Sequence, residues 1–281
     1  MIDKQEFTDI IKRALVEDIG KGDITSNLLI PENQQAEMAF VAREEMVACG
    51  VFIPEMVYNI IGGGINVTVR TEESRLAAKN SVLAVAKGNS RVLLAGERVT
   101  LNIMQRMCGI ATLTSKYVAA VKGTKAVILD TRKTIVNIRA MDKYAVTIGG
   151  GKNHRMRLDD MVLIKDNHIA LCGGIKQAMV KARAANLPIV IECDNLHQVE
   201  EALLELPDRI MLDNMDNATL RKAVSMVYGK IPLEASGGIS LETVGAIAQT
   251  GVDYISVGKI THSATAVDIG ADIVFINKAS A

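Results

Sequence analysis

Six short aliphatic runs between residues 126 and 257 constrain the fold of this chain more than any other feature. They cover residues 126–129, 161–164, 189–191, 210–212, 233–235 and 254–257, and each leads directly into polar, charged or glycine residues. Helical apolar patterns lie between them, at residues 174–185, 196–204, 218–227 and 241–250. The order strand, polar tip, helix repeats about every 20–35 residues, which is typical of a β/α barrel. A further strand near residues 144–148 is compatible with an incomplete or open barrel and equally with a closed one.

The residues before this repeat follow another pattern. Residues 5–16 have apolar residues at helical spacing, and residues 36–42, 65–69 and 81–86 are short alternating segments separated by glycine-rich turns. From about residue 92 to residue 120 the pattern is helical again, with an expected break at Gly109. The sequence therefore predicts a small α+β region in front of the repeat.

Composition excludes several classes of protein. The chain has 281 residues, of which 49% are hydrophobic and only 3% aromatic, so its core must be aliphatic. Lys and Arg number 32, as do Asp and Glu, so no overall positive field favours nucleic acid. Cys49, Cys108, Cys172 and Cys193 have no metal-ligand or redox spacing, which indicates reduced, mostly buried thiols. With neither a signal-peptide pattern nor a membrane-length apolar run, we expect a soluble, cytoplasmic protein that binds neither nucleic acid nor membrane.

The polar tips predict a single site. The carboxyl ends of barrel strands meet at one mouth, where barrel active sites lie. Lys133, Lys165, Glu192, Asp213 and Ser236 each follow one of the aliphatic runs, so we expect them to converge there. The alternative is that each charged tip simply ends its strand in solvent. That explanation is weaker for six successive tips than for one.

Two late tips are rich in glycine, which lets backbone N–H groups approach a phosphate closely. They are Ser236-Gly237-Gly238 and Val257-Gly258-Lys259. The last barrel loops commonly bind phosphate, so the pair indicates a phosphorylated substrate. The stretch from Asp130 to His168 is rich in cations, whereas Glu192 and Asp213 would repel phosphate unless a cation lay between. The residues therefore indicate a phosphate-bearing substrate, a carboxylate-bearing partner, and Mg²⁺ or a cationic sugar centre between them.

Five longer motifs stand between residues 129 and 168. They are Leu129-Asp130-Thr131-Arg132-Lys133-Thr134, Lys143-Tyr144-Ala145-Val146, Gly149-Gly150-Gly151, Asn153-His154-Arg155-Met156 and Met161-Val162-Leu163-Ile164-Lys165-Asp166-Asn167-His168. Shorter ones elsewhere are Glu17-Asp18-Ile19-Gly20, Gly96-Glu97-Arg98, Leu212-Asp213-Asn214, Ala235-Ser236-Gly237-Gly238 and Thr261-His262-Ser263. Together these motifs resemble the quinolinate phosphoribosyltransferases, which are also called carboxylating nicotinate-nucleotide pyrophosphorylases. The resemblance covers nearly the whole chain and keeps the spacing.

The resemblance implies a fold and an assembly. It implies an N-terminal α/β sandwich over residues 1–105, with the tail at 268–281 packed on it, and an open seven-stranded α/β barrel over residues 106–267. It also implies a homodimer or larger even oligomer with shared sites, which Arg98 would enter from the neighbouring subunit. Arg98, Asn102 and Arg106 share one helix face at i, i+4 and i+8, and an ordinary solvated face explains that spacing too.

By the same resemblance, the chain transfers phosphoribosyl from phosphoribosyl pyrophosphate to quinolinate with decarboxylation, a step of de novo NAD biosynthesis that needs Mg²⁺. The catalytic residues would be Lys133, Lys165, Glu192 and Asp213, with Mg²⁺ near the two acids. Substrate would be bound by Arg98, Thr131, Arg132, Lys133, His154, Arg155, Lys165, Glu192, Asp213, Ser236, Gly237, Gly238, Val257, Gly258, Lys259 and His262. Of these, Ser236 to Gly238 and Val257 to Lys259 would cradle the 5′-phosphate. No covalent nucleophile is required, because orientation and electrostatics suffice.

The sequence departs from the family pattern at three places. After Thr134 the family usually has Thr-Pro-Gly-Leu-Arg, where this chain has Ile135-Val136-Asn137-Ile138-Arg139. Gly is usual at Arg157, and Val-Pro at Ala264-Thr265. The geometry of the loop after Thr134, and the roles of Arg139, Arg157 and His168, are left open; His168 could simply cap the segment after it.

Three other functions compete. A paralogue could use a different aromatic acid, although the Arg132-Lys133, His154-Arg155 and Lys165 set argues against it. An aldolase-like barrel would use Lys133 or Lys165 as a Schiff-base amine in a dry pocket. A catalytically silent protein would bind phosphoribosyl pyrophosphate without turnover.

Overall fold

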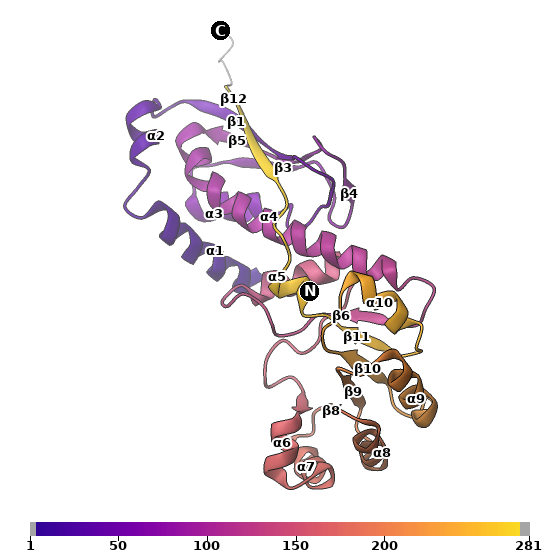
Figure 1. Cartoon of the computed structure of the whole chain (residues 1–281). Helices are drawn as coiled ribbons and strands as arrows, with labels where there is room; N and C mark the ends of the chain where they lie inside the picture. Colours follow the sequence, from indigo (N-terminus) through magenta and orange to yellow (C-terminus); the bar gives the residue numbers. More distant parts are fainter. Residues whose placement is uncertain (1–3, 276–281) are drawn as a thin grey trace. The chain divides into compact units, whose positions relative to one another are not determined.

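The computed structural model describes residues 4–275 and divides into two compact units (Figure 1). The first unit comprises residues 1–113, 135–149 and 264–281, and the second comprises residues 114–134 and 150–263. From the sequence we expected the boundary at residue 105. The difference arises because helix α4 (Ser90–Ala120) runs unbroken through that position, and because residues 135–149 group with the first unit. Of the expected C-terminal tail, residues 276–281 lie outside the described residues.

The first unit is built on an antiparallel sheet with the strand order β12-β1-β5-β3 among the described residues. Its strands are β1 (Gln35–Ala42), β3 (Asn66–Val69), β5 (Val82–Asn89) and β12 (Ile269–Phe275), and β2 (Met46–Val47) pairs separately with β4 (Leu76–Ala77). Its helices are α1 (Lys4–Ile19), α2 (Ile24–Leu29), α3 (Ile53–Ile61), the first part of α4, and α5 (Arg139–Ile148). The sheet thus joins the end of the described chain to its beginning, because β12 pairs with β1.

The core of the first unit follows the predicted patterns. Ala36, Met38 and Phe40 alternate on the buried face of β1, as the period of a strand requires. The rings of Phe7 of α1, Phe52 and Tyr144 pack against one another, with the three pairs of ring centroids 5.7–6.1 Å apart. Tyr144 belongs to α5, so the strand expected at residues 144–148 is wrong. A short apolar cluster does not distinguish a buried helix from a strand by periodicity.

Gly109 does not break the long helix. A side chain at Gly109 would overlap the backbone carbonyl of Thr265, so the glycine permits close packing of residues 265–266 on α4. Three residues earlier, Arg106 donates two hydrogen bonds of 2.7 Å to the buried Asp142 of α5. Arg106 is therefore engaged inside the first unit, and the expected polar stripe with Arg98 and Asn102 does not continue to it as a solvated face.

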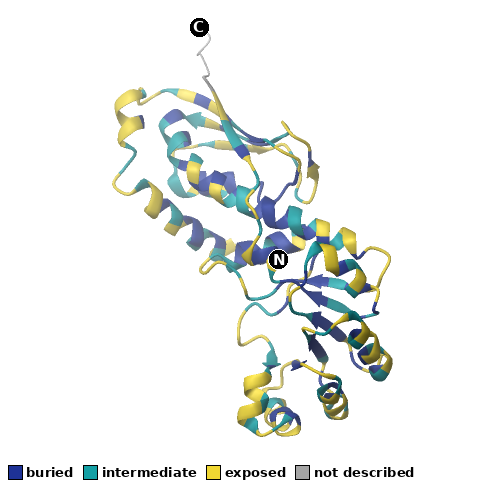
Figure 2. Ribbon diagram, in the orientation of Figure 1, coloured by how far each residue is buried: buried dark blue, intermediate teal, exposed yellow. Residues whose placement is uncertain are grey.

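The second unit contains a parallel sheet with the order β6-β11-β10-β9-β8-β7 among residues 114–263. The strands are β6 (Val127–Leu129), β7 (Val162–Ile164), β8 (Ile189–Cys193), β9 (Arg209–Asp213), β10 (Leu233–Ser236) and β11 (Tyr254–Ser256). The helices are α6 (Asp166–Cys172), α7 (Ile175–Ala182) with a 3₁₀ turn (Arg183–Ala185), α8 (Leu196–Glu205), α9 (Asn217–Val227), α10 (Leu241–Ala248) and α11 (Lys259–His262). All six aliphatic runs are strands, and the strands of this sheet are mainly buried (Figure 2). In β8 all five residues are buried.

The expected seven-stranded barrel is not shown. Within the described part of the second unit, β6 and β7 lie at opposite edges of the sheet and do not pair. Beyond β6 the sheet continues only as an isolated parallel bridge between Leu129 and Lys152. The fold is thus mixed α/β, with an antiparallel sheet in one unit and a parallel, helix-covered sheet in the other.

Candidate anion-binding active site

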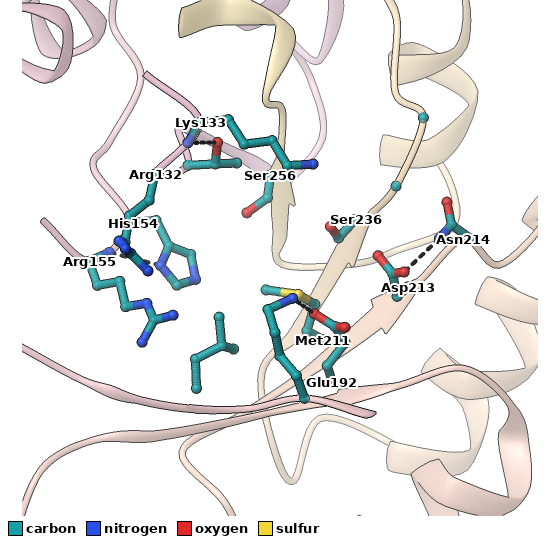
Figure 3. Close-up of a pocket in the computed structure, with 15 residues that line it drawn as sticks. Arg132, Lys133, His154, Arg155, Glu192, Met211, Asp213, Asn214, Ser236 and Ser256 are labelled. Carbon is teal, nitrogen blue, oxygen red and sulfur yellow. Dashed lines mark hydrogen bonds and ion pairs between the residues drawn. The ribbon is translucent and has the colours of Figure 1, made fainter. Parts of the chain in front are cut away.

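A cavity of about 510 Å³ opens at the carboxyl ends of the parallel strands (Figure 3). Every residue that lines it belongs to the second unit. The lining residues are Thr131, Arg132, Lys133, His154, Arg155, Leu163, Lys165, Glu192, Met211, Asp213, Asn214, Ser236, Gly237, Gly238 and Ser256. The tips that the sequence grouped at one mouth therefore do share one cavity.

Cations form one wall of this cavity (Figure 3). Arg132 and Lys133 follow β6, and the Lys133 N–H donates to Thr131 Oγ1 at 3.0 Å. His154 and Arg155 come from the loop before β7, where the buried Asp130 accepts the His154 N–H at 2.8 Å. Burial, and then the positive charge of Arg132, lowers the pKa of Arg155. Two guanidinium groups that repel each other favour an anion between them.

Carboxylates stand across the cavity from these cations. Glu192 is the second-to-last residue of β8 and forms an ion pair with Lys165, which follows β7. Asp213 ends β9 and accepts a hydrogen bond from the Asn214 amide. The Lys165 side chain is 44% exposed, so its ammonium is open to a ligand while its charge is balanced by Glu192.

Glycines close the far side, where β10 ends. Gly237 has φ +94°, and a side chain there would meet the side chain and backbone nitrogen of Asn214. Gly238 has φ +61° with open space around it. Such backbone leaves N–H groups accessible to a phosphate beside Ser236.

Five expected site residues do not line the cavity. Val257 is buried and Lys259 exposed, whereas Gly258 lies against the stem of Lys133 and the ring of His262. Their segment instead supports the β6 tip, because Thr261 donates to the Lys133 carbonyl at 2.8 Å. The fifth is Arg98, on α4 in the first unit, whose exposed side chain lies 3.8 Å from Glu97.

Two histidines have defined hydrogen bonds. His168 Nδ1 accepts the Lys165 N–H at 3.0 Å, so His168 caps the start of α6, one of the roles left open by the sequence. His154 Nδ1 accepts the Arg155 N–H at 2.8 Å, and the His154 ring borders the cavity.

The departure from the family pattern at Asn137 has a physical explanation. Asn137 adopts φ +66° in the left-handed region. The family usually has glycine there, and asparagine is among the residues that best tolerate this conformation. The substitution therefore preserves the backbone turn that glycine supplies.

Sequence reasoning missed the apolar and buried parts of the site. Leu163 and Met211 supply apolar surface to the cavity, and Ser256 adds a hydroxyl. Beneath them lies Glu234, a fully buried carboxylate in the middle of β10. In the sequence, the one sign of this buried group is that Glu234 stands inside an otherwise aliphatic run. Its meaning depends on partners far away in sequence.

The neighbours of Glu234 favour its ionised carboxylate form. Burial raises the pKa of its carboxyl, but the neighbouring His154 imidazole and hydrogen bonds from Arg209 and Ser256 outweigh burial, and the net pKa is lowered. Arg209 Nη1 lies 2.8 Å from Glu234 Oε2, and its guanidinium is 4.0 Å from the centre of the Tyr254 ring.

This arrangement predicts a pH-dependent stability. A lowered folded-state pKa stabilises the fold above the ordinary value of 4.5, and the effect is lost as pH falls through the folded-state value. We expect Glu234→Gln to reduce the free energy of unfolding at pH 7 by about 3 kcal/mol, because the largely buried guanidinium of Arg209 then lacks a negative charge to pair with. Urea unfolding from pH 7 to pH 3 should show the gap between wild type and variant shrinking below pH 4.5. A constant gap would contradict an ionised Glu234.

The side chains of the cavity show whether it could hold a magnesium ion. Among the described residues no three His, Cys, Asp or Glu side chains form a metal-binding group. Mg²⁺ is, however, often held by one or two carboxylates together with substrate phosphates, and Glu192 and Asp213 offer that set. The residues fit an ion that arrives with a phosphorylated substrate.

These features define a class of protein: an α/β enzyme that handles anions at the carboxyl edge of a parallel sheet. Residues 23–108 match the model of the N-terminal domain of quinolinate phosphoribosyl transferase, and residues 110–272 match that of its C-terminal domain. The chain is 42% identical to a carboxylating nicotinate-nucleotide pyrophosphorylase from Mycobacterium leprae, over 94% of this chain and 96% of that protein.

Solved structures agree. The nicotinate-nucleotide pyrophosphorylase of Francisella tularensis superposes with a TM-score of 0.93 at 38% identity, covering 98% of both chains. That of Ehrlichia chaffeensis gives a TM-score of 0.91 at 46% identity, covering 95% of this chain and 98% of the other. The chain belongs to the quinolinate phosphoribosyl transferase family.

Proposed function

We propose that this chain transfers the phosphoribosyl group of phosphoribosyl pyrophosphate to quinolinate and releases pyrophosphate and CO₂, leaving nicotinate mononucleotide for NAD biosynthesis. One observation supports it most: Arg132, Lys133, Arg155 and Lys165 share a cavity with Glu192, Asp213 and the Gly237-Gly238 turn. A substrate with two carboxylates and one with phosphates have complementary charge to such a cavity.

The residues divide the work by position. Arg132, His154, Arg155 and Lys165 bind the quinolinate carboxylates, and Lys133 faces the pyrophosphate. Ser236, Gly237 and Gly238 hold the 5′-phosphate with backbone N–H groups. Glu192 and Asp213 accept hydrogen bonds from the ribose hydroxyls and stabilise the positive charge that develops on the sugar.

The reaction needs alignment more than a nucleophile from the protein. The ring nitrogen of quinolinate forms a bond to the sugar carbon while the bond from that carbon to pyrophosphate breaks, and pyrophosphate keeps the electron pair. The nitrogen becomes a pyridinium, which stabilises the carbanion left when the adjacent carboxylate departs as CO₂; a proton then takes its place. Leu163 and Met211 give the ring an apolar surface beside the charges.

Magnesium is part of the proposal. Glu192 and Asp213 are the residues that would hold it, together with the substrate's phosphates. When bound, the ion offsets the negative charge of the leaving pyrophosphate.

The Schiff-base alternative is less well supported. An amine nucleophile needs a dry environment that favours its neutral form. Lys165 instead forms an ion pair with Glu192, and the Lys133 side chain is exposed.

The proposal extends to assembly and location. We propose a homodimer in which Arg98 of one subunit completes the site of its partner, working in the cytoplasm. None of the helices among residues 4–275 combines the length and apolarity needed to cross a bilayer.

A subunit-mixing experiment tests the shared site. Arg98→Ala should lower activity by roughly 10²-fold, as expected when one charged contact to a developing charge is lost. Mixing it with Lys165→Ala after verified subunit exchange should restore part of the wild-type rate, because some dimers then carry one intact site. Activity that stays at the level of the two separate variants would count against the shared site.

A coupled assay tests the function. Purified protein with quinolinate, phosphoribosyl pyrophosphate and Mg²⁺ should release pyrophosphate and CO₂ in equal amounts. Nicotinate in place of quinolinate is the control and should release no CO₂. Binding of phosphoribosyl pyrophosphate without turnover would instead support the silent binding protein, and turnover of nicotinate but not quinolinate would support a paralogue.

A further inference from the structure

The buried Glu234 lies directly under the cavity, on the same face of the sheet. In a strand, residues two apart point to the same side, so Glu234 shares a face with Ser236, which lines the cavity. Its neighbour in β9 is Met211, which also lines the cavity, and its neighbour in β11 is Tyr254. Glu234 is therefore one layer below the ligand space.

The two oxygens of Glu234 face different partners. Oε2 accepts from Arg209 at 2.8 Å, on the side away from the cavity. Oε1 accepts from the hydroxyl of Ser256 and lies 3.5 Å from Nε2 of His154. Ser256 and His154 both line the cavity, so one buried carboxylate contacts two of its walls.

The hydrogen bond at Nδ1 of His154 assigns the tautomer of its ring. Its Nδ1 accepts the Arg155 backbone N–H, so Nδ1 cannot carry a proton in this arrangement. The ring proton must then lie on Nε2, the atom that faces Glu234. A carboxylate oxygen is the partner that favours an N–H at this position.

We propose that Glu234 is a positioning residue, which holds His154 in its Nε2–H tautomer and thereby sets the orientation of the His154–Arg155 wall toward quinolinate. Glu234 does not touch substrate; it acts through the imidazole. The inference rests on the proposed function for its substrate, whereas the tautomer is a property of the protein alone.

Glutamine at this position should turn the favourable contact between Glu234 and His154 Nε2 into an unfavourable one. Arg209 is an obligate donor, so the amide oxygen of Glu234→Gln would turn toward it. The amide NH₂ would then face Ser256 and Nε2 of His154, and two N–H groups would oppose each other. We expect His154 to move its proton to Nδ1 or to rotate, which disturbs the bond to the Arg155 N–H.

Asp253→Asn is a matched control. Asp253 is also an acid of the second unit that accepts hydrogen bonds, from the Leu233 N–H at 2.9 Å and from Lys125 at 2.7 Å. It precedes β11, at the end of the strands opposite the cavity, and does not line it. Its amide variant should lose stability without altering His154.

The experiment combines NMR with kinetics. The chain has four histidines, so ¹⁵N-histidine labelling gives few ring signals, and His154→Asn assigns one set. The ligand-free wild type should show His154 protonated at Nε2, and Glu234→Gln should lose that signature. In the same variant KM for quinolinate should rise at least about tenfold and KM for phosphoribosyl pyrophosphate change less than about threefold, as expected for loss of one aligned contact. Asp253→Asn should match wild type in both readouts.

Several results would overturn the inference. A wild-type His154 protonated at Nδ1 would do so without any variant, so the test survives a Glu234→Gln protein that fails to fold. An unchanged tautomer and unchanged KM in folded Glu234→Gln would also reject it, as would equal effects in Asp253→Asn. If the wild type does not turn over quinolinate, the proposed function fails, and the tautomer measurement still decides the role of Glu234.

Discussion

Lys165→Ala will lower kcat/KM for the phosphoribosyl transfer by roughly 10³-fold while the protein stays folded, because the charge it places in the cavity acts on groups whose charge changes during the reaction. Lys165 follows β7 directly, its ammonium lines the cavity, and its side chain is 44% exposed, so truncation removes function without opening a core void. Its loss also leaves Glu192 without its cation, which adds repulsion toward anionic substrates.

Steady-state kinetics with circular dichroism measures this effect. Lys181→Ala on α7 is the control, because Lys181 is an exposed lysine of the same unit that does not line the cavity. The control should retain wild-type kcat/KM. Near-wild-type activity in folded Lys165→Ala would remove Lys165 from the site.

Gly237→Ala will impair phosphate binding far more than Gly238→Ala. Both glycines have positive φ, so each substitution carries a backbone strain of about 1–3 kcal/mol. Only at Gly237 does the added carbon also meet backbone, 2.8 Å from the nitrogen of Asn214. That nitrogen donates to the Ser236 carbonyl at 2.9 Å, so the clash pushes apart the tips of β9 and β10.

The two alanine variants can be compared directly. For Gly237→Ala we expect KM for phosphoribosyl pyrophosphate to rise by roughly 10²-fold, since misplacement of a binding group by about 1 Å costs that much. Gly238→Ala should stay within about fivefold of wild type, in line with backbone strain alone. Equal losses in the two variants would mean that strain, and not the contact with Asn214, governs this turn.

The parallel sheet could be predicted because its strands are buried on both faces. Burial of that kind produces continuous aliphatic runs, which can be recognised in the sequence without knowledge of what packs against them. The end of each run then located Lys165, Glu192, Asp213 and Ser236, because the carboxyl ends of parallel strands lie at one edge. Local pattern was sufficient for this part of the site.

Other features depend on contacts between distant segments. Residues 144–148 form a helix whose Tyr144 packs on Phe7 and Phe52, and nothing in the local pattern indicates that environment. Glycine is needed at position 109 because the backbone of Thr265, far along the chain, leaves no room for a side chain there. The role of Glu234 likewise depends on His154 and Arg209, and that of the 257–262 segment depends on the Thr261 bond to Lys133. Such positions become interpretable only when the partners are placed.

We propose that one cavity of the second unit binds a pyridine dicarboxylate among Arg132, the His154–Arg155 pair and Lys165. A crystallographic difference map of the protein soaked with quinolinate alone tests it most directly, since no turnover can occur without the second substrate. We expect density for the ring against Leu163 and Met211, with its carboxylates on the cations. Density for quinolinate elsewhere, with this cavity left empty at saturating ligand, would contradict it.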